Sequence, residues 1–222
     1  MNGPPRMSAP APANVFVLGT GRCGTTTFIE ACRHVANRTA AHESRISEAG
    51  PGRLAYPLGH VEADNRLSWM LGRLAEDWGD RALYVHMLRD EAAVARSYLA
   101  RWKIDESIIY GWRTSIVPGI RPGTPPLEVA LDYARTVNAN IRAFLLSRAH
   151  VATVRLERAE EDFGRVWDQA GFEGDRAAAL AEWRVPHNAA RPPREGAAAR
   201  LRRLPAKLGR VARKLPDFLD RA

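Results

Sequence analysis

A short apolar run, a glycine-rich turn and an amphipathic segment follow one another near the start of the chain. Residues 14–18 form the apolar run, and Gly19 and Gly24 frame the turn. Residues 25–35 then repeat apolar side chains every three or four positions, which is typical of a helix. A strand joined to a helix by so short a connection is the unit from which helix-covered parallel sheets are built.

Strand-like and helix-like segments alternate along the rest of the chain. Strands are expected at 38–42, 82–88 and 151–156, and helices at 65–77, 91–103, 127–147 and 161–170. This alternation predicts an α/β protein with three layers, a P-loop-like fold in which helices flank a central parallel sheet. Glycines and prolines gather at 46–59 and 111–126, where we expect loops, the second of them flexible. Sites in such folds lie at the carboxyl ends of the strands.

Composition divides the chain into three segments. Residues 1–13 are rich in Pro, Ala and Gly without the apolar stretch of a signal peptide, so we expect them to be disordered. Residues 14–190 are long enough for one core and therefore one domain. Residues 191–222 form a basic tail: from residue 200 onward it holds eight Lys or Arg against two Asp, a net of +6 within the chain's +8. Because the charge lies in a tail, no nucleic-acid groove is expected.

The expected location is cytoplasmic, since no run approaches the roughly 18 apolar residues of a membrane span. Two cysteines, Cys23 and Cys32, are too few for a disulfide framework and lack zinc spacing, so no metal is expected. The tail repeats leucines between its basic residues. One hypothesis is a basic amphipathic helix that attaches the chain peripherally to an anionic inner membrane surface; packing against the domain is the alternative.

The glycine turn has the design of an anion site, because backbone N–H groups and a helix N-terminus can point at the same place. An ordinary turn, in which the glycines only relieve backbone strain, is the alternative. A nucleotide kinase or NTPase loop would carry lysine where Thr25 stands, and a cysteine-dependent phosphatase would carry arginine where Ile29 stands. Cys23 is therefore not expected to be a nucleophile. A kinase or NTPase remains an alternative function, as does a non-catalytic module that binds phosphate or lipid headgroups.

The segment Val15 to Thr27 resembles the 5'-phosphosulfate loop of sulfotransferases that use 3'-phosphoadenosine 5'-phosphosulfate (PAPS), in a distant, bacterial-type branch. The resemblance implies a set of binding residues: Gly21, Arg22, Cys23, Gly24, Thr25, Thr26 and Thr27. Arg22 would neutralise charge on the bridging oxygen as sulfur leaves, while Thr25 and Thr26 would donate to the 5'-phosphate. Cytosolic members usually carry tryptophan in place of Thr27.

A second motif lies where that family has one. Arg89 follows the expected strand 82–88, and Ser97 comes eight residues later. This spacing is similar to the family's 3'-phosphate motif, whose arginine and serine bind the phosphate that distinguishes PAPS from ATP. Taken singly, the two residues would read as the start of a helix and a solvated serine. The family's late Arg-Lys-Gly loop is absent; Arg191 and Arg194 are candidates to replace it, and a solvated linker is the alternative.

Sulfuryl transfer to a hydroxyl is an in-line displacement that needs a base and no metal. Glu43, with His42 as its neighbour or substitute, is the preferred base, and a surface pair that caps a loop is the alternative. Alternation could also place His60, Glu62 and Asp64 on one strand face, although Asp64 is better suited to cap the next helix. The resemblance thus implies a PAPS-dependent sulfotransferase acting on a glycan, lipid-linked or small-molecule hydroxyl. Fold alone does not choose the acceptor.

Overall fold

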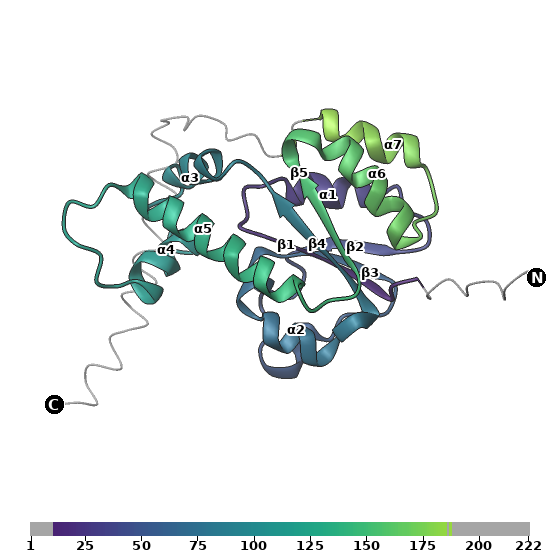
Figure 1. Cartoon of the computed structure of the whole chain (residues 1–222), viewed down its shortest axis with the longest axis horizontal. Coiled ribbons are helices and arrows are strands. Elements are labelled where there is room, and N and C mark those ends of the chain that lie inside the picture. The colour runs from purple at the N-terminus through teal and green to yellow at the C-terminus, as the bar shows by residue number, and fades with distance from the viewer. Residues whose placement is uncertain (1–10, 186, 188–222) are drawn as a thin grey trace, which may run out of the picture. The chain divides into compact units, whose positions relative to one another are not determined.

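The computed structural model describes residues 11–185 and 187. At its centre is a five-stranded sheet whose neighbouring strands are all parallel, in the order β2-β3-β1-β4-β5 (Figure 1). The strands are β1 (Asn14–Gly19), β2 (Thr39–His42), β3 (His60–Ala63), β4 (Ala82–Leu88) and β5 (Val151–Arg155). The chain places β2 and β3 on one side of β1 and β4 and β5 on the other. The carboxyl end of β1 is therefore the switch point at which open α/β sheets bind ligands.

Helices cover both faces of the sheet and complete three layers (Figure 1). One face carries α1 (Thr25–Cys32), α6 (Ala159–Ala170) and α7 (Arg176–Ala181). The other carries α2 (Leu71–Asp77), α3 (Glu91–Leu99), α4 (Ile108–Gly111) and α5 (Pro126–Leu145). The α/β fold with a central parallel sheet, expected from the sequence, is confirmed.

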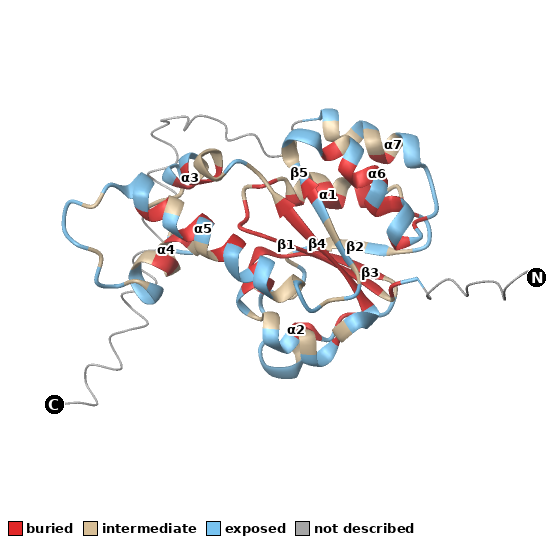
Figure 2. Ribbon diagram, in the orientation of Figure 1, coloured by how far each residue is buried: buried red, intermediate tan, exposed pale blue. Residues whose placement is uncertain are grey.

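The central strand is apolar throughout because both of its faces are covered. Val15 and Val17 point into the core beneath α1 and α6, whereas Phe16 and Leu18 point into the core beneath α3 and α5. Figure 2 shows β1 and β4 buried along most of their length, as expected for strands with a helix layer on each face. Burial on both faces explains why these two strands are the easiest to predict from sequence.

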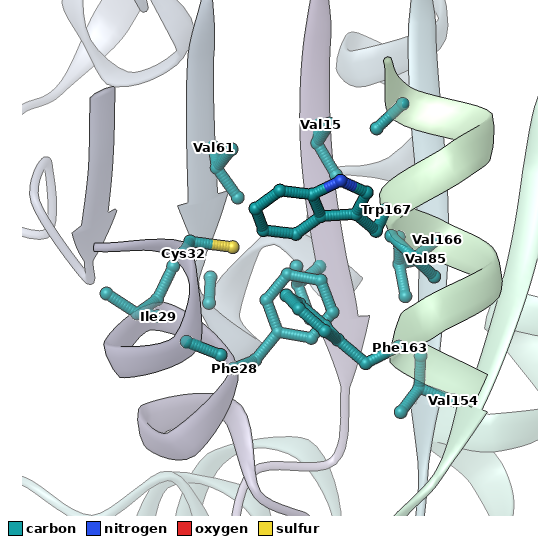
Figure 3. Close-up of a cluster of buried hydrophobic side chains, with 14 of the residues drawn as sticks. Val15, Phe28, Ile29, Cys32, Val61, Val85, Val154, Phe163, Val166 and Trp167 are labelled. Atoms are coloured by element: carbon teal, nitrogen blue, oxygen red, sulfur yellow. The ribbon is translucent and has the colours of Figure 1, made fainter. Parts of the chain in front are cut away.

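The core on the α1 side is built around an aromatic contact. Phe28 of α1 and Phe163 of α6 meet edge to face with ring centroids 5.1 Å apart, and Trp167 lies above them (Figure 3). Cys32 is buried in the same cluster, with the other apolar residues of α1. This packing fixes the position of α1, and with it the direction in which its N-terminus points.

Several elements differ from the sequence expectation. The helix expected over 65–77 is divided at Met70 into a 3₁₀ helix, Asn65–Trp69, and α2. The loop expected over 111–126 begins with the end of α4 and a π-helical turn, because Trp112 is buried against Tyr133 with ring centroids 5.7 Å apart. The helix expected to reach residue 103 ends at Leu99, and α7 was not expected.

The N-terminal boundary of the fold lies before residue 14. Ala13, within the segment expected to be disordered, donates its N–H to the Arg81 carbonyl at 2.7 Å and accepts from the Gly59 N–H at 3.1 Å. Residues 1–10 and the basic tail 191–222, including the two arginines considered for the cofactor, lie outside the described residues. Within the described ranges, no helix is both long and apolar enough to span a bilayer.

Candidate functional site

The glycine turn leaves the central strand in an unusual backbone conformation. Gly21 and Gly24 have φ of 72° and 102°, a region that glycine reaches without a side-chain clash. Arg22 adopts φ of 59° between them, and among the described non-glycine residues only Glu43 shares a positive φ. Strained backbone of this kind concentrates at functional sites. Both residues had been singled out from the sequence for catalytic roles.

The loop is fixed from its core side by hydrogen bonds to its carbonyl groups. Tyr98 of α3 and Tyr133 of α5 both donate their hydroxyls to the Thr20 carbonyl, at 2.6 and 2.7 Å. Ser68 donates to the Gly19 carbonyl at 3.2 Å. The two helices therefore hold the loop in place while α1 begins on its far side, at Thr25. The first N–H groups of that helix have no acceptor within the helix, and its dipole favours an anion there.

A cavity of about 240 Å³ opens beside the loop. Its walls come from the loop, from the turn after β2, from the 3₁₀ helix after β3 and from the end of α3 with the connection that follows. The lining residues are Gly21, Arg22, Thr25, Thr26, His42, Glu43, Asn65, Arg66, Tyr98, Arg101, Glu106, Ser107 and Ile108. Residues predicted to hold the 5'-phosphosulfate and both predicted bases thus share one cavity.

The two predicted phosphate motifs meet directly. Arg22 Nε donates to Ser97 Oγ at 3.1 Å, and Arg89 Nη1 donates to the Arg22 carbonyl at 3.0 Å. Burial lowers the pKa of Arg22, and the positive charges of Arg101 and Arg89 lower that pKa further. The positive charges of the Arg101 and Arg89 guanidinium groups thus lie close enough to Arg22 to disfavour its charged form, and a bound anion would reduce this repulsion. Neither Arg89 nor Ser97 lines the 240 Å³ cavity; they lie behind Arg22.

The other loop residues predicted to bind the cofactor, Cys23, Gly24 and Thr27, do not line the cavity. The Cys23 side chain is fully buried, and burial raises the pKa of its thiol to about 11, which fits the expectation that it is not a nucleophile. Gly24 precedes α1 and Thr27 lies in its first turn, and neither lines the cavity. Gly24 has φ of 102°, a conformation that favours glycine, and a Cβ there would also push the ends of the Leu156 and Met87 side chains aside.

The two base candidates approach the loop from the end of β2. His42 Nε2 lies 3.1 Å from Thr25 Oγ1. Glu43 Oε2 lies 3.0 Å from Arg66 Nη1, in an ion pair whose two side chains are each about 30% exposed. The pair is therefore accessible from the cavity, where a substrate hydroxyl could reach the carboxylate.

The three rival residues on β3 and just after it are structural. Glu62 and Asp64 are fully buried and His60 is nearly so, and none of them lines the cavity. Asp64 accepts from the Arg66 N–H at 2.8 Å, which caps the 3₁₀ helix as expected, and it also pairs with Arg53. Burial raises the pKa of Asp64 despite these donors.

Several cavity residues were not predicted from the sequence: Asn65, Arg66, Tyr98, Arg101, Glu106, Ser107 and Ile108. For Arg101 a signal existed, because it follows Ser97 by four residues within the helix expected over 91–103, a spacing that places two residues on one helix face. For Arg66 the sequence carries no such signal, because its position beside Glu43 depends on the pairing of β2 with β3.

Comparison with known proteins gives a limited result. No protein-family model matches the chain, and no curated protein matches it in sequence. Among solved structures it is similar to mouse sulfotransferase SULT7A1 complexed with PAP, with a TM-score of 0.46 and 11% sequence identity. The match covers 78% of this chain and 64% of that one, so this chain spans less than two thirds of the other's length. A likeness at this level concerns only the course of the chain and gives no information about its activity.

Proposed function

We propose that this chain transfers a sulfuryl group from PAPS to a hydroxyl group. The observation that carries the proposal is the direct contact between the two phosphate motifs, Arg22 with Ser97 and Arg89 with the Arg22 carbonyl. PAPS bears anionic groups on both the 5' and the 3' positions of one ribose. A ligand of that design needs two anion-binding positions side by side, whereas ATP needs only the first.

The side chains at the site suit such a ligand. In the cavity, Thr25, Thr26 and the N-terminus of α1 offer hydroxyl and amide donors and Arg22 offers a guanidinium group. Arg89 offers a second guanidinium group behind Arg22. All of these groups donate to oxygen anions, and charge-assisted hydrogen bonds from arginine are the strongest of them. The chemistry of these donors therefore supports a phosphate or sulfate group as the ligand.

PAPS, when bound, supplies the sulfuryl group and a phosphate leaving group. Arg22 and the start of α1 would balance the negative charge that grows on the leaving oxygen, a contribution that increases towards the transition state. Arg89 and Ser97 would hold the 3'-phosphate. His42, hydrogen-bonded to the Thr25 hydroxyl, would orient that hydroxyl.

Glu43 would accept the proton of the acceptor hydroxyl, and Arg66 would orient its carboxylate. The remaining wall, Glu106 to Ile108, comes from the end of the connection after α3 and the start of α4, and it would contact the acceptor. We propose that the acceptor is a glycan, a lipid-linked molecule or a small molecule that presents its hydroxyl at Glu43.

The test is transfer of ³⁵S from labelled PAPS to a panel of phenols, oligosaccharides and lipid-linked sugars. Arg22→Ala should lower kcat/KM at least about 100-fold, because it removes an electrostatic contact to the leaving group. Arg33→Ala is the matched control, since that arginine lies just beyond α1, has a side chain that is 67% exposed, and pairs with Glu30 on the helix surface. Equal rates for Arg22→Ala and wild type would exclude the proposed role. Magnesium-dependent transfer of phosphate from ATP by the wild type would favour a nucleotide kinase instead.

A further inference from the structure

The turn that carries Glu43 is held in a conformation that its sequence does not favour. Glu43 has φ of 53° and lies between His42 at the end of β2 and Ser44, with no glycine in the turn. A left-handed glutamate persists only where its surroundings impose it. The contacts that impose it therefore set where the Glu43 carboxylate points.

Those contacts come from β3, and Glu62 supplies two of them. The Ser44 N–H donates to Glu62 Oε1 at 2.9 Å, and the Ser44 hydroxyl donates to Glu62 Oε2 at 2.5 Å. The Glu43 N–H itself donates to the Ala63 carbonyl at 3.0 Å. The backbone is thus tied to β3 at Glu43 and at the residue after it.

A buried polar network holds Glu62 in turn. His60 Nε2 lies 3.1 Å from Glu62 Oε2, while the other ring nitrogen lies 2.7 Å from Thr39 Oγ1. The His60 ring stacks on Tyr56 with centroids 5.6 Å apart, and the Tyr56 hydroxyl accepts from Arg53 at 3.2 Å. A buried network of satisfied groups allows little freedom to any of its members.

The same network also reaches the partner of Glu43. Arg53 pairs with Asp64, and Asp64 caps the 3₁₀ helix by accepting from the Arg66 N–H at 2.8 Å. Arg66 then pairs with Glu43 at 3.0 Å. Two buried carboxylates, Glu62 and Asp64, which are two residues apart in the chain, thus fix the backbone on both sides of the Glu43–Arg66 pair.

We infer that Glu62 is a positioning residue that aims Glu43 into the cavity. This inference rests on the proposed function. Glu62 is unsuited to act as the base itself, because its side chain has no exposed surface and both of its oxygens face hydrogen-bonding partners. Its carboxylate acts through the Ser44 turn, and the effect is to hold the Glu43 oxygens where an acceptor hydroxyl arrives.

The test compares Glu62→Gln with Glu62→Ala. Glutamine keeps an oxygen that can accept from the Ser44 N–H and an amide that can donate to the Ser44 hydroxyl, whereas alanine keeps neither. Positioning predicts that Glu62→Gln retains kcat within about threefold and that Glu62→Ala loses at least about tenfold in kcat, with KM for PAPS unchanged in both. Glu43→Gln should lower kcat at least about 100-fold, whether it is combined with Glu62→Gln or with Glu62→Ala.

A second readout does not depend on transfer. Amide hydrogen exchange at Glu43 and Ser44 should quicken in Glu62→Ala and stay slow in Glu62→Gln, and Ser44→Ala provides a milder variant should Glu62→Ala fold poorly. If Glu62→Gln proves as inactive as Glu43→Gln while exchange at the turn stays slow, Glu62 is itself the base and the inference is wrong. Unchanged kcat and unchanged exchange in Glu62→Ala would also overturn the inference.

Titration of the wild type and each variant with adenosine 3',5'-bisphosphate separates this inference from the proposed function. A wild type that does not bind this nucleotide would contradict PAPS as the sulfuryl donor, and would leave the role of Glu62 in holding the turn to be judged by hydrogen exchange.

Discussion

At the scale of single residues, Gly21 shows how closely the loop is packed. A Cβ at this position would lie 2.6 Å from Tyr98 Oη and 2.9 Å from Asn65 Nδ2. Tyr98 cannot move aside easily, because it is 2% exposed and its hydroxyl is hydrogen-bonded to the Thr20 carbonyl. Glycine is therefore required here for space as well as for its positive φ.

Gly21→Ala should consequently lower both stability and affinity for adenosine 3',5'-bisphosphate. Gly59→Ala is the matched control, since Gly59 has φ of 74° and open space around the position of a Cβ. The control measures backbone strain alone, about 1–2 kcal/mol. Gly21→Ala should lower the free energy of unfolding by at least about 1 kcal/mol more than Gly59→Ala does, because its Cβ overpacks against Tyr98. Equal losses in urea unfolding of the two variants would show that the contact with Tyr98 is unimportant.

At the scale of elements, β4 and α5 are joined through a buried histidine. His86 Nε2 lies 3.2 Å from Asn138 Oδ1, and burial lowers the pKa of His86 to about 4, with smaller effects in the same direction from Arg142 and Arg155. The neutral form of His86 is the one that the folded state accommodates.

Acid should therefore weaken this contact between elements. Because the folded pKa lies below the ordinary 6.5, the unfolded chain binds more protons between pH 6.5 and about 4, and stability falls as pH is lowered through that range. The loss due to His86 should reach up to about 3 kcal/mol. His86→Gln keeps a donor for Asn138 without titrating, so its unfolding free energy should fall less between pH 7 and pH 4.5. An identical fall in the variant and the wild type would contradict this account.

The sequence predicted elements best where burial on both faces leaves a continuous apolar run. Strand 82–88 is reproduced residue for residue by β4, which is covered on both faces. The break at Met70 could not be foreseen, because apolar residues keep helical spacing across it. The end of α3 and the π-helical turn at Trp112 likewise depend on tertiary packing rather than on local pattern.

At the scale of the whole domain, the candidate site depends on strand order. Each proposed phosphate motif is contiguous in sequence, so its residues could be singled out by their resemblance to a family motif. The structure brings Arg22 within 3.1 Å of Ser97 because β4 lies beside β1. Nothing in the sequence indicated that β3 would lie between β1 and β2. That order places Arg66 against Glu43 and leaves Glu62 inside, which is why the ion pair and the buried network were not predicted.

The central claim is that one ligand bridges two neighbouring anion positions, and calorimetric titration tests it most directly. The wild type should bind adenosine 3',5'-bisphosphate at least about tenfold more tightly than ADP, because a charge-assisted contact to the 3'-phosphate contributes about 1.5–3 kcal/mol. Arg89→Ala should remove that preference, while Arg96→Ala, on the same helix as Ser97 and 62% exposed, should keep it. Equal or tighter binding of ADP by the wild type, or an undiminished preference in Arg89→Ala, would contradict the account.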